Sequence, residues 1–164
     1  MEPAKSDLIS STTTLLTGTL QRVTALRWSQ PATEASASKT IGAAGGTLTA
    51  PGGLTLVVPK GAVSSNTTFT VTRLAGNVVA YDFEPHGTSF AQPLQLTQST
   101  AGTNFNTYAL RTLVRGGYYK DKSLINQVLG LVFVSEFRPA SVSSDRSAVK
   151  FTVDHFSGYM VSMD

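Results

Sequence analysis

The chain has 164 residues, of which 41% are hydrophobic and only 14% are charged, against about 25% charged residues in an ordinary soluble domain. The net charge of +3 comes from basic residues scattered along the chain, which argues against a nucleic-acid-binding module. The absence of cysteine excludes disulfides, thiolate zinc sites and cysteine nucleophiles, and no apolar run is long enough for a membrane-spanning helix.

Residues 1–38 are expected to form an N-terminal arm. Apolar residues recur there at steps of three and four, which predicts one short amphipathic helix. These residues are Leu15, Leu16, Leu20, Val23 and Leu26. So short a helix needs a surface to pack on, and residues 30–38 have the composition of a linker. That surface is either the body of this chain or a partner, and Trp28 is either an interface anchor or the side chain that docks the helix on the sandwich; we favour a partner. The expected contact residues are Leu16, Leu20, Val23, Arg27 and Trp28.

Residues 39–164 are expected to form a separate domain of short strands joined by turns. The expected strands cover residues 47–50, 54–58, 67–74, 78–83, 94–97, 108–114, 149–153 and 159–161. Serine and threonine supply 40 residues of the chain, and such a surface of hydroxyl groups suits exposed strands. Residues 124–132 fit either a helix or a strand, and we expect a short helix that runs into a strand. The whole pattern predicts an all-β fold, an antiparallel β-sandwich.

Four segments, in this order, resemble a ZU5-type domain. They are residues 45–48 (Gly-Gly-Thr-Leu), 54–62 (Leu-Thr-Leu-Val-Val-Pro-Lys-Gly-Ala), 83–94 (Phe-Glu-Pro-His-Gly-Thr-Ser-Phe-Ala-Gln-Pro-Leu) and 155–159 (His-Phe-Ser-Gly-Tyr). The resemblance implies a compact antiparallel β-sandwich that serves binding and assembly. Within this family, the chain is similar to the modules found in exported bacterial proteins, which are often lipoproteins.

The same resemblance raises one catalytic alternative, because some relatives of ZU5 modules cut themselves between Phe and Ser of a His-Phe-Ser sequence. Here Ser157 would attack the carbonyl of Phe156, with His155 as the base and His86 as a second helper. The favoured interpretation is structural: Phe156 is a core aromatic residue, and Ser157 begins a turn. We therefore expect no catalytic residues, and the self-cleaving module is the alternative.

No cofactor or metal is expected. Asp82 and Glu84 alternate on one strand face near His86, which is interpreted as a solvated face rather than a metal site. The densest basic stretch is expected to be a solvated rim, with a phosphate or lipid headgroup contact as the alternative. Its members are Arg111, Arg115, Lys120 and Lys122. A carbohydrate-binding or adhesion module would need exposed aromatic residues, for which Tyr118 and Tyr119 are the candidate pair.

Together these features predict a non-catalytic accessory subunit of a larger membrane-associated complex on the periplasmic side, such as a photosynthetic reaction centre or a respiratory complex. Its expected partners are protein subunits, a peripheral membrane contact is compatible with that role, and neither nucleic acid nor a small-molecule substrate is expected. No hydrophobic segment follows Met1, so any signal peptide or lipid anchor is expected upstream of this numbering.

Overall fold

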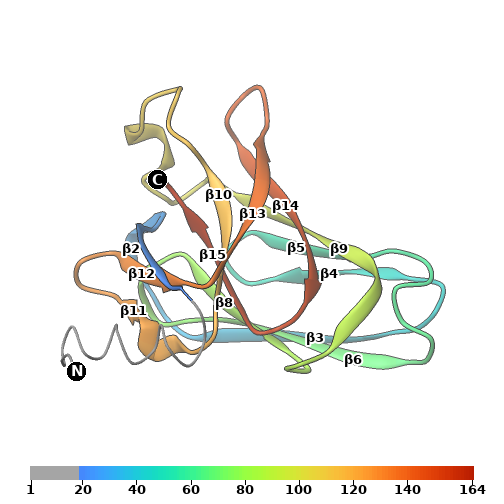
Figure 1. Ribbon diagram of the computed structural model, residues 1–164. Coiled ribbons are helices and arrows are strands. Elements are labelled where there is room, and N and C mark those ends of the chain that lie inside the picture. The colour runs from blue at the N-terminus through green and yellow to red at the C-terminus, as the bar shows by residue number, and fades with distance from the viewer. Residues whose placement is uncertain (1–18) are drawn as a thin grey trace.

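The strands of this protein pair in antiparallel fashion throughout residues 19–164, the part of the chain that the computed structural model describes (Figure 1). The all-β sandwich expected from the sequence is therefore confirmed. In chain order the strands are β1 (Gln21–Thr24), β2 (Arg27–Ala32), β3 (Ala35–Ile41), β4 (Gly46–Ala50), β5 (Leu54–Val58), β6 (Thr67–Arg73), β7 (Gly76–Val78), β8 (Ala80–Glu84), β9 (Ser89–Ser99), β10 (Arg115–Tyr119), β11 (Ile125–Asn126), β12 (Leu131–Val134), β13 (Glu136–Val142), β14 (Ala148–His155) and β15 (Gly158–Ser162).

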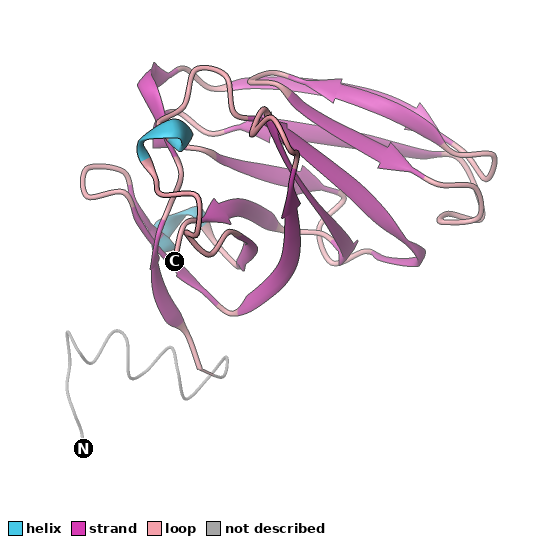
Figure 2. Ribbon diagram, turned by 90° about the horizontal axis from the view of Figure 1, so that it is seen from above, coloured by secondary structure: helices cyan, strands magenta, loops and turns pink. Residues whose placement is uncertain are grey.

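Ten of these strands form one long sheet that curls back on itself. Its order is β3-β6-β8-β15-β10-β13-β14-β9-β5-β4. The two end strands, β3 and β4, are neighbours in the chain, and Lys39 Nζ on β3 donates a hydrogen bond of 2.8 Å to the Thr47 carbonyl on β4. The sheet is thereby nearly closed, and its two layers are seen from above in Figure 2.

The main core fills the space inside the curled sheet. Inward residues alternate along each strand, so that Leu54, Leu56 and Val58 of β5 are buried while the residues between them are partly exposed. The centre is aromatic: the Phe156 ring lies 4.8 Å from that of Phe90 and 5.3 Å from that of Phe83, between centroids. Such contacts between aromatic rings stabilise the packing of the layers by more than the burial of apolar area alone would.

A second, smaller core lies on the opposite face of the same sheet. β15 is buried on both faces, because Tyr159 and Val161 belong to the main core while Met160 belongs to the second. The short sheet β1-β12-β11 supplies the cover through Val23 and Val132. The N-terminal segment is thus needed to bury one face of a central strand.

Hydroxyl pairs line the exposed face between β3 and β6. Ser36 with Thr72, Ser38 with Thr70 and Thr40 with Thr68 lie 2.7–2.8 Å apart, oxygen to oxygen. These cross-strand pairs place the abundant serine and threonine on strand surfaces, where hydroxyl pairs stabilise a sheet.

The N-terminal helix predicted from the sequence is wrong over the residues that the structure describes. Leu20, Val23 and Leu26 share an apolar stripe only on a helix, whereas the chain forms β1 and β2 there. Burial in the folded chain overrides the helical spacing of these residues, because Leu26 and Val23 lie in two different cores. The prediction of a linker at residues 30–38 is wrong too, since β3 begins at Ala35 and pairs with β6 along its whole length. Leu15 and Leu16 lie outside the described residues.

The helix expected within residues 124–132 is wrong as well. The chain forms a 3₁₀ turn, η2 (Lys122–Leu124), and then the hairpin β11–β12. The Asn126 side chain closes this hairpin by accepting hydrogen bonds from the backbone amides of Val128 and Leu129. The following strand is confirmed as β12 and β13. Between residues 19 and 164 no helix has the length and apolar character required to cross a membrane.

Candidate functional site

The His155-Phe156-Ser157 segment lies at the turn from β14 to β15. The Phe156–Ser157 peptide is held on both sides, since the Phe156 carbonyl accepts from Gly87 and the Ser157 carbonyl accepts from Phe83. The Ser157 hydroxyl donates to the Lys120 carbonyl at 3.1 Å rather than to a histidine. This arrangement favours the structural interpretation, and an intact-mass measurement separates it from self-cleavage.

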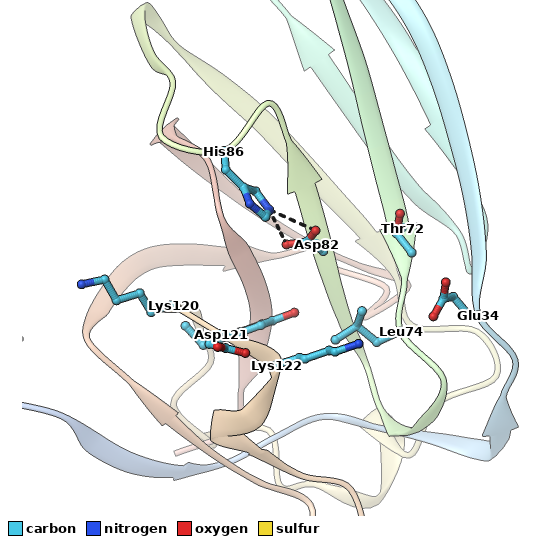
Figure 3. Close-up of a pocket in the computed structure, with 9 residues that line it drawn as sticks. Glu34, Thr72, Leu74, Asp82, His86, Lys120, Asp121 and Lys122 are labelled. Atoms are coloured by element: carbon cyan, nitrogen blue, oxygen red, sulfur yellow. Dashed lines mark hydrogen bonds and ion pairs between the residues drawn. The ribbon is translucent and has the colours of Figure 1, made fainter. Parts of the chain in front are cut away.

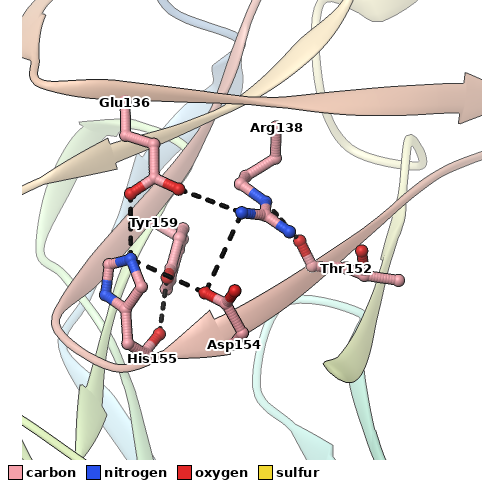
Figure 4. A network of polar contacts seen from close by, with 6 residues as sticks. All are labelled: Glu136, Arg138, Thr152, Asp154, His155 and Tyr159. Carbon is pink, nitrogen blue, oxygen red and sulfur yellow. Dashed lines mark hydrogen bonds and ion pairs between the residues drawn. The ribbon is translucent and has the colours of Figure 1, made fainter. Parts of the chain in front are cut away.

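His155 is part of a polar network on the outer surface of β13 and β14 (Figure 4). Its Nε2 lies 2.8 Å from Glu136 Oε1, and Arg138 Nη1 lies 2.9 Å from Glu136 Oε2. Burial alone would raise the pKa of Glu136, but the hydrogen bonds from His155 and Arg138 outweigh it and lower that pKa. The same guanidinium lies 3.9 Å from Asp154, so a positive charge already stands among these carboxylates.

His86 occupies a different site, far in sequence from His155, and the two histidines share no hydrogen bond. Its Nε2 lies 2.8 and 3.0 Å from the two carboxylate oxygens of Asp82 on β8. The pair borders an open cavity of about 480 Å³, which is also lined by Glu34, Asp121 and Lys122 (Figure 3). His86 therefore bonds Asp82 and not Ser157, whose hydroxyl donates to the Lys120 carbonyl.

Glu84 completes a group of three around His86. Its carboxylate, that of Asp82 and the imidazole of His86 each offer one ligand atom, and these atoms lie within 4.8 Å of one another. Among residues 19–164, no lysine or arginine forms an ion pair with Asp82 or Glu84. This group therefore differs in charge from the network around Glu136.

The large exposed hydrophobic side chains of residues 19–164 belong to two loops, which we call the apolar loops. Leu110 and Leu113, 80% and 57% exposed, lie in the loop at residues 108–114, and Val128 and Leu129, 78% and 61% exposed, lie in the loop at 127–130. In Figure 1 both loops lie on the side of the sandwich that carries the C-terminus, residues 108–114 above it and residues 127–130 below it. Sequence reasoning missed this surface because residues 108–114 were expected to form a strand, which is wrong.

The expected contact residues of the arm are not gathered on one surface. Val23 is buried in the second core, and Trp28 packs against the main core beneath the Arg73 guanidinium. Arg27 and Leu20 are partly exposed, and Leu16 lies outside the described residues. Val23 and Trp28 therefore stabilise this chain itself.

The candidate aromatic pair for carbohydrate binding, Tyr118 and Tyr119, does not form an exposed platform. Tyr119 is buried, and its hydroxyl donates to the Tyr81 carbonyl at 2.7 Å. Burial, with a smaller effect of the Asp82 carboxylate, raises the pKa of Tyr119 well above its ordinary value. Tyr118 packs edge-on against His155.

The basic stretch is divided among different surroundings. Arg115 donates to the Asp164 carbonyl at 2.6 Å and stacks on Phe137, with 3.5 Å from the guanidinium to the ring centroid. Lys120 and Lys122 line the cavity beside His86, and Arg111 is exposed on an apolar loop. These cations are therefore not organised as one anion-binding cluster.

Comparison of the chain with models of known protein families and with curated proteins finds no match. The resemblance to a ZU5-type domain therefore stays a prediction, which rests on the four sequence segments quoted above.

Proposed function

We propose that this protein is a non-catalytic accessory subunit that binds a protein partner through its apolar loops, within a membrane-associated assembly on the periplasmic side. The observation that carries the proposal is the exposure of Leu110, Leu113, Val128 and Leu129 at one end of the sandwich. Isolated exposed apolar residues are ordinary, but large ones confined to two loops at one end are characteristic of an interaction surface.

The composition of the loops favours a protein rather than a lipid surface as the occupant. Within residues 108–114 and 127–130 the only charged side chain is Arg111. Binding to anionic lipid uses clusters of four or more basic residues, roughly, whereas the centre of a protein interface is depleted of charge. The faces of the sandwich are rich in hydroxyl groups and carry few charges that would repel a protein partner.

The rest of the proposal has weaker supports, which come from the sequence. The lack of cysteine suits an exported bacterial protein, and the segments that resemble a ZU5-type domain favour a binding role over a catalytic one. The Ser157 hydroxyl, engaged with the Lys120 carbonyl, agrees with a role that needs no nucleophile.

The test is purification of the tagged protein from its native membranes in mild detergent, followed by mass spectrometry. We expect recovery of a defined set of subunits in fixed stoichiometry. A variant with Leu110→Ser and Leu113→Ser, and another with Val128→Ser and Leu129→Ser, should each lower that recovery roughly tenfold or more, because central apolar contacts contribute about 2 kcal/mol or more each to binding.

A matched control carries Lys60→Ser and Gln92→Ser, two exposed residues outside the apolar loops, and should recover the same subunits as the wild type. Circular dichroism of all variants verifies that the sandwich is intact. The proposal is overturned if the wild type is recovered alone or with lipid only, or if the loop variants retain the partners.

A further inference from the structure

The three side chains around His86 are brought together by the local backbone. Asp82 and Glu84 are two residues apart on β8, so both point away from the core that Phe83 fills between them. The chain then turns at residues 85–87, and this turn returns the His86 ring over Asp82 (Figure 3). One imidazole nitrogen and two carboxylates thus converge on a small volume.

The group of Asp82, Glu84 and His86 differs in charge from the second group of possible metal ligands, which is Glu136, Asp154 and His155. Around Glu136, Asp154 and His155 the Arg138 guanidinium supplies a positive charge within 2.9 Å of one carboxylate and 3.9 Å of the other. No ion pair with a lysine or arginine of residues 19–164 compensates Asp82 and Glu84. Lys120 and Lys122 line the cavity beside them, and Figure 3 shows Lys120 pointing away from the His86–Asp82 pair and Lys122 extending toward Leu74.

The spacing of the ligand atoms suits a metal ion with little rearrangement. Ligand atoms in a tetrahedral zinc site lie about 3.3 Å apart, because the bonds are about 2.0–2.1 Å long. His86 Nε2 lies 2.8 and 3.0 Å from the Asp82 oxygens, and the third ligand atom is within 4.8 Å. Asp82 and His86 keep 32% and 54% of their side-chain surfaces exposed, which leaves an ion open to water at its remaining positions.

We propose that Asp82, Glu84 and His86 form a surface site for a divalent transition-metal ion of the Zn²⁺ type, at the mouth of the cavity lined by Glu34 and Asp121. The donor set favours this class, because imidazole nitrogen suits Zn²⁺ and its neighbours in the transition series, whereas Ca²⁺ and Mg²⁺ prefer oxygen ligands. Glu34 and Asp121 line the same cavity, together with Lys120 and Lys122. This site is independent of the apolar loops.

The experiment is isothermal titration calorimetry of the full chain, prepared without a histidine tag and treated with chelator, against ZnCl₂ at pH 7.5. We expect saturable binding of one Zn²⁺ per chain. His86→Gln and Asp82→Asn should each weaken it by more than the roughly tenfold loss that removal of an outer-shell partner alone causes. A titration with MgCl₂ in place of ZnCl₂ should give no saturable binding.

The other histidine provides the matched control. His155→Gln removes the only other imidazole, in the group that Arg138 already neutralises, and should bind Zn²⁺ as tightly as the wild type. Thermal unfolding verifies that each variant folds, and Glu84→Gln, at an exposed position, replaces any that does not. The proposal is overturned by the absence of saturable Zn²⁺ binding, by binding that survives His86→Gln, or by an equal loss in His155→Gln.

Discussion

Glu136 is a residue whose surroundings make the stability of the protein depend on pH. Its carboxylate accepts hydrogen bonds from both His155 and Arg138, and these contacts lower its pKa despite the opposing effect of burial. A carboxylate whose pKa is lower in the folded state stabilises that state when ionised. The stabilisation is complete above the ordinary pKa of 4.5 and is lost as the pH falls through the folded-state value.

We therefore predict that Glu136→Gln lowers the melting temperature at pH 7 and that the difference from wild type shrinks below about pH 4.5. The contacts are partly exposed, so they contribute at most about 1 kcal/mol, or about 2–4 °C in a chain of this size. Differential scanning calorimetry between pH 3 and pH 7 measures the effect. Glu34→Gln, outside the network, is the control, and a difference that grows on acidification would contradict the assignment.

The sequence pointed to His155, and to His86 together with its partner Asp82, but not to Glu136, the partner of His155. Glu136 is 19 residues from His155 in the chain, and it comes close only because β13 and β14 pair with Ala140 opposite Phe151. A strand register of this kind depends on turn geometry and on which face is buried, and neither is readable from local alternation. The proximity of Asp82 to His86 could be predicted from the sequence, because Asp82 lies on the same strand face as Glu84, just before the turn that carries His86.

At the scale of elements, the strands with clear alternation were predictable and the N-terminal segment was not. Residues 54–58 and 149–153 alternate in hydrophobicity, and they lie within β5 and β14. Residues 20–26 carry apolar side chains at helical steps, yet Leu26 faces the main core and Val23 the second. A periodicity that serves two different cores cannot be distinguished from a helix by spacing alone.

We predict that two leucines of the same apolar stripe, Leu20 and Leu26, contribute unequally to the free energy of unfolding. Leu26 is fully buried and Leu20 is partly exposed, so Leu26→Ala should lower the free energy of unfolding by about 2–5 kcal/mol and Leu20→Ala by much less. Urea denaturation at pH 7 measures both. Equal losses would instead support a helix that presents both leucines to one surface.

At the scale of the whole molecule, the two cores are coupled through β8 and β15. Tyr81 and Tyr159 contribute to the main core, while their neighbours Ala80 and Met160 contribute to the second. The N-terminal segment contributes to both, because Val23 lies in the second core and Leu26 in the main core. Residues 19–38, expected to be an arm, are therefore part of the same packed structure as the strands that follow.

Trp28 makes this coupling measurable, because it is the only tryptophan and lies on β2 within the expected arm. It packs against the main core, and it forms a β-bridge with Thr103. We predict that Trp28 fluorescence and far-UV circular dichroism report the same midpoint and the same slope in urea, since a single domain of this size unfolds in one cooperative transition. An independent arm would instead release Trp28 at a lower urea concentration, while the circular dichroism of the sheet stayed unchanged. Leu26→Ala should shift both transitions together, because Leu26 joins the segment of Trp28 to the core that the sheet encloses.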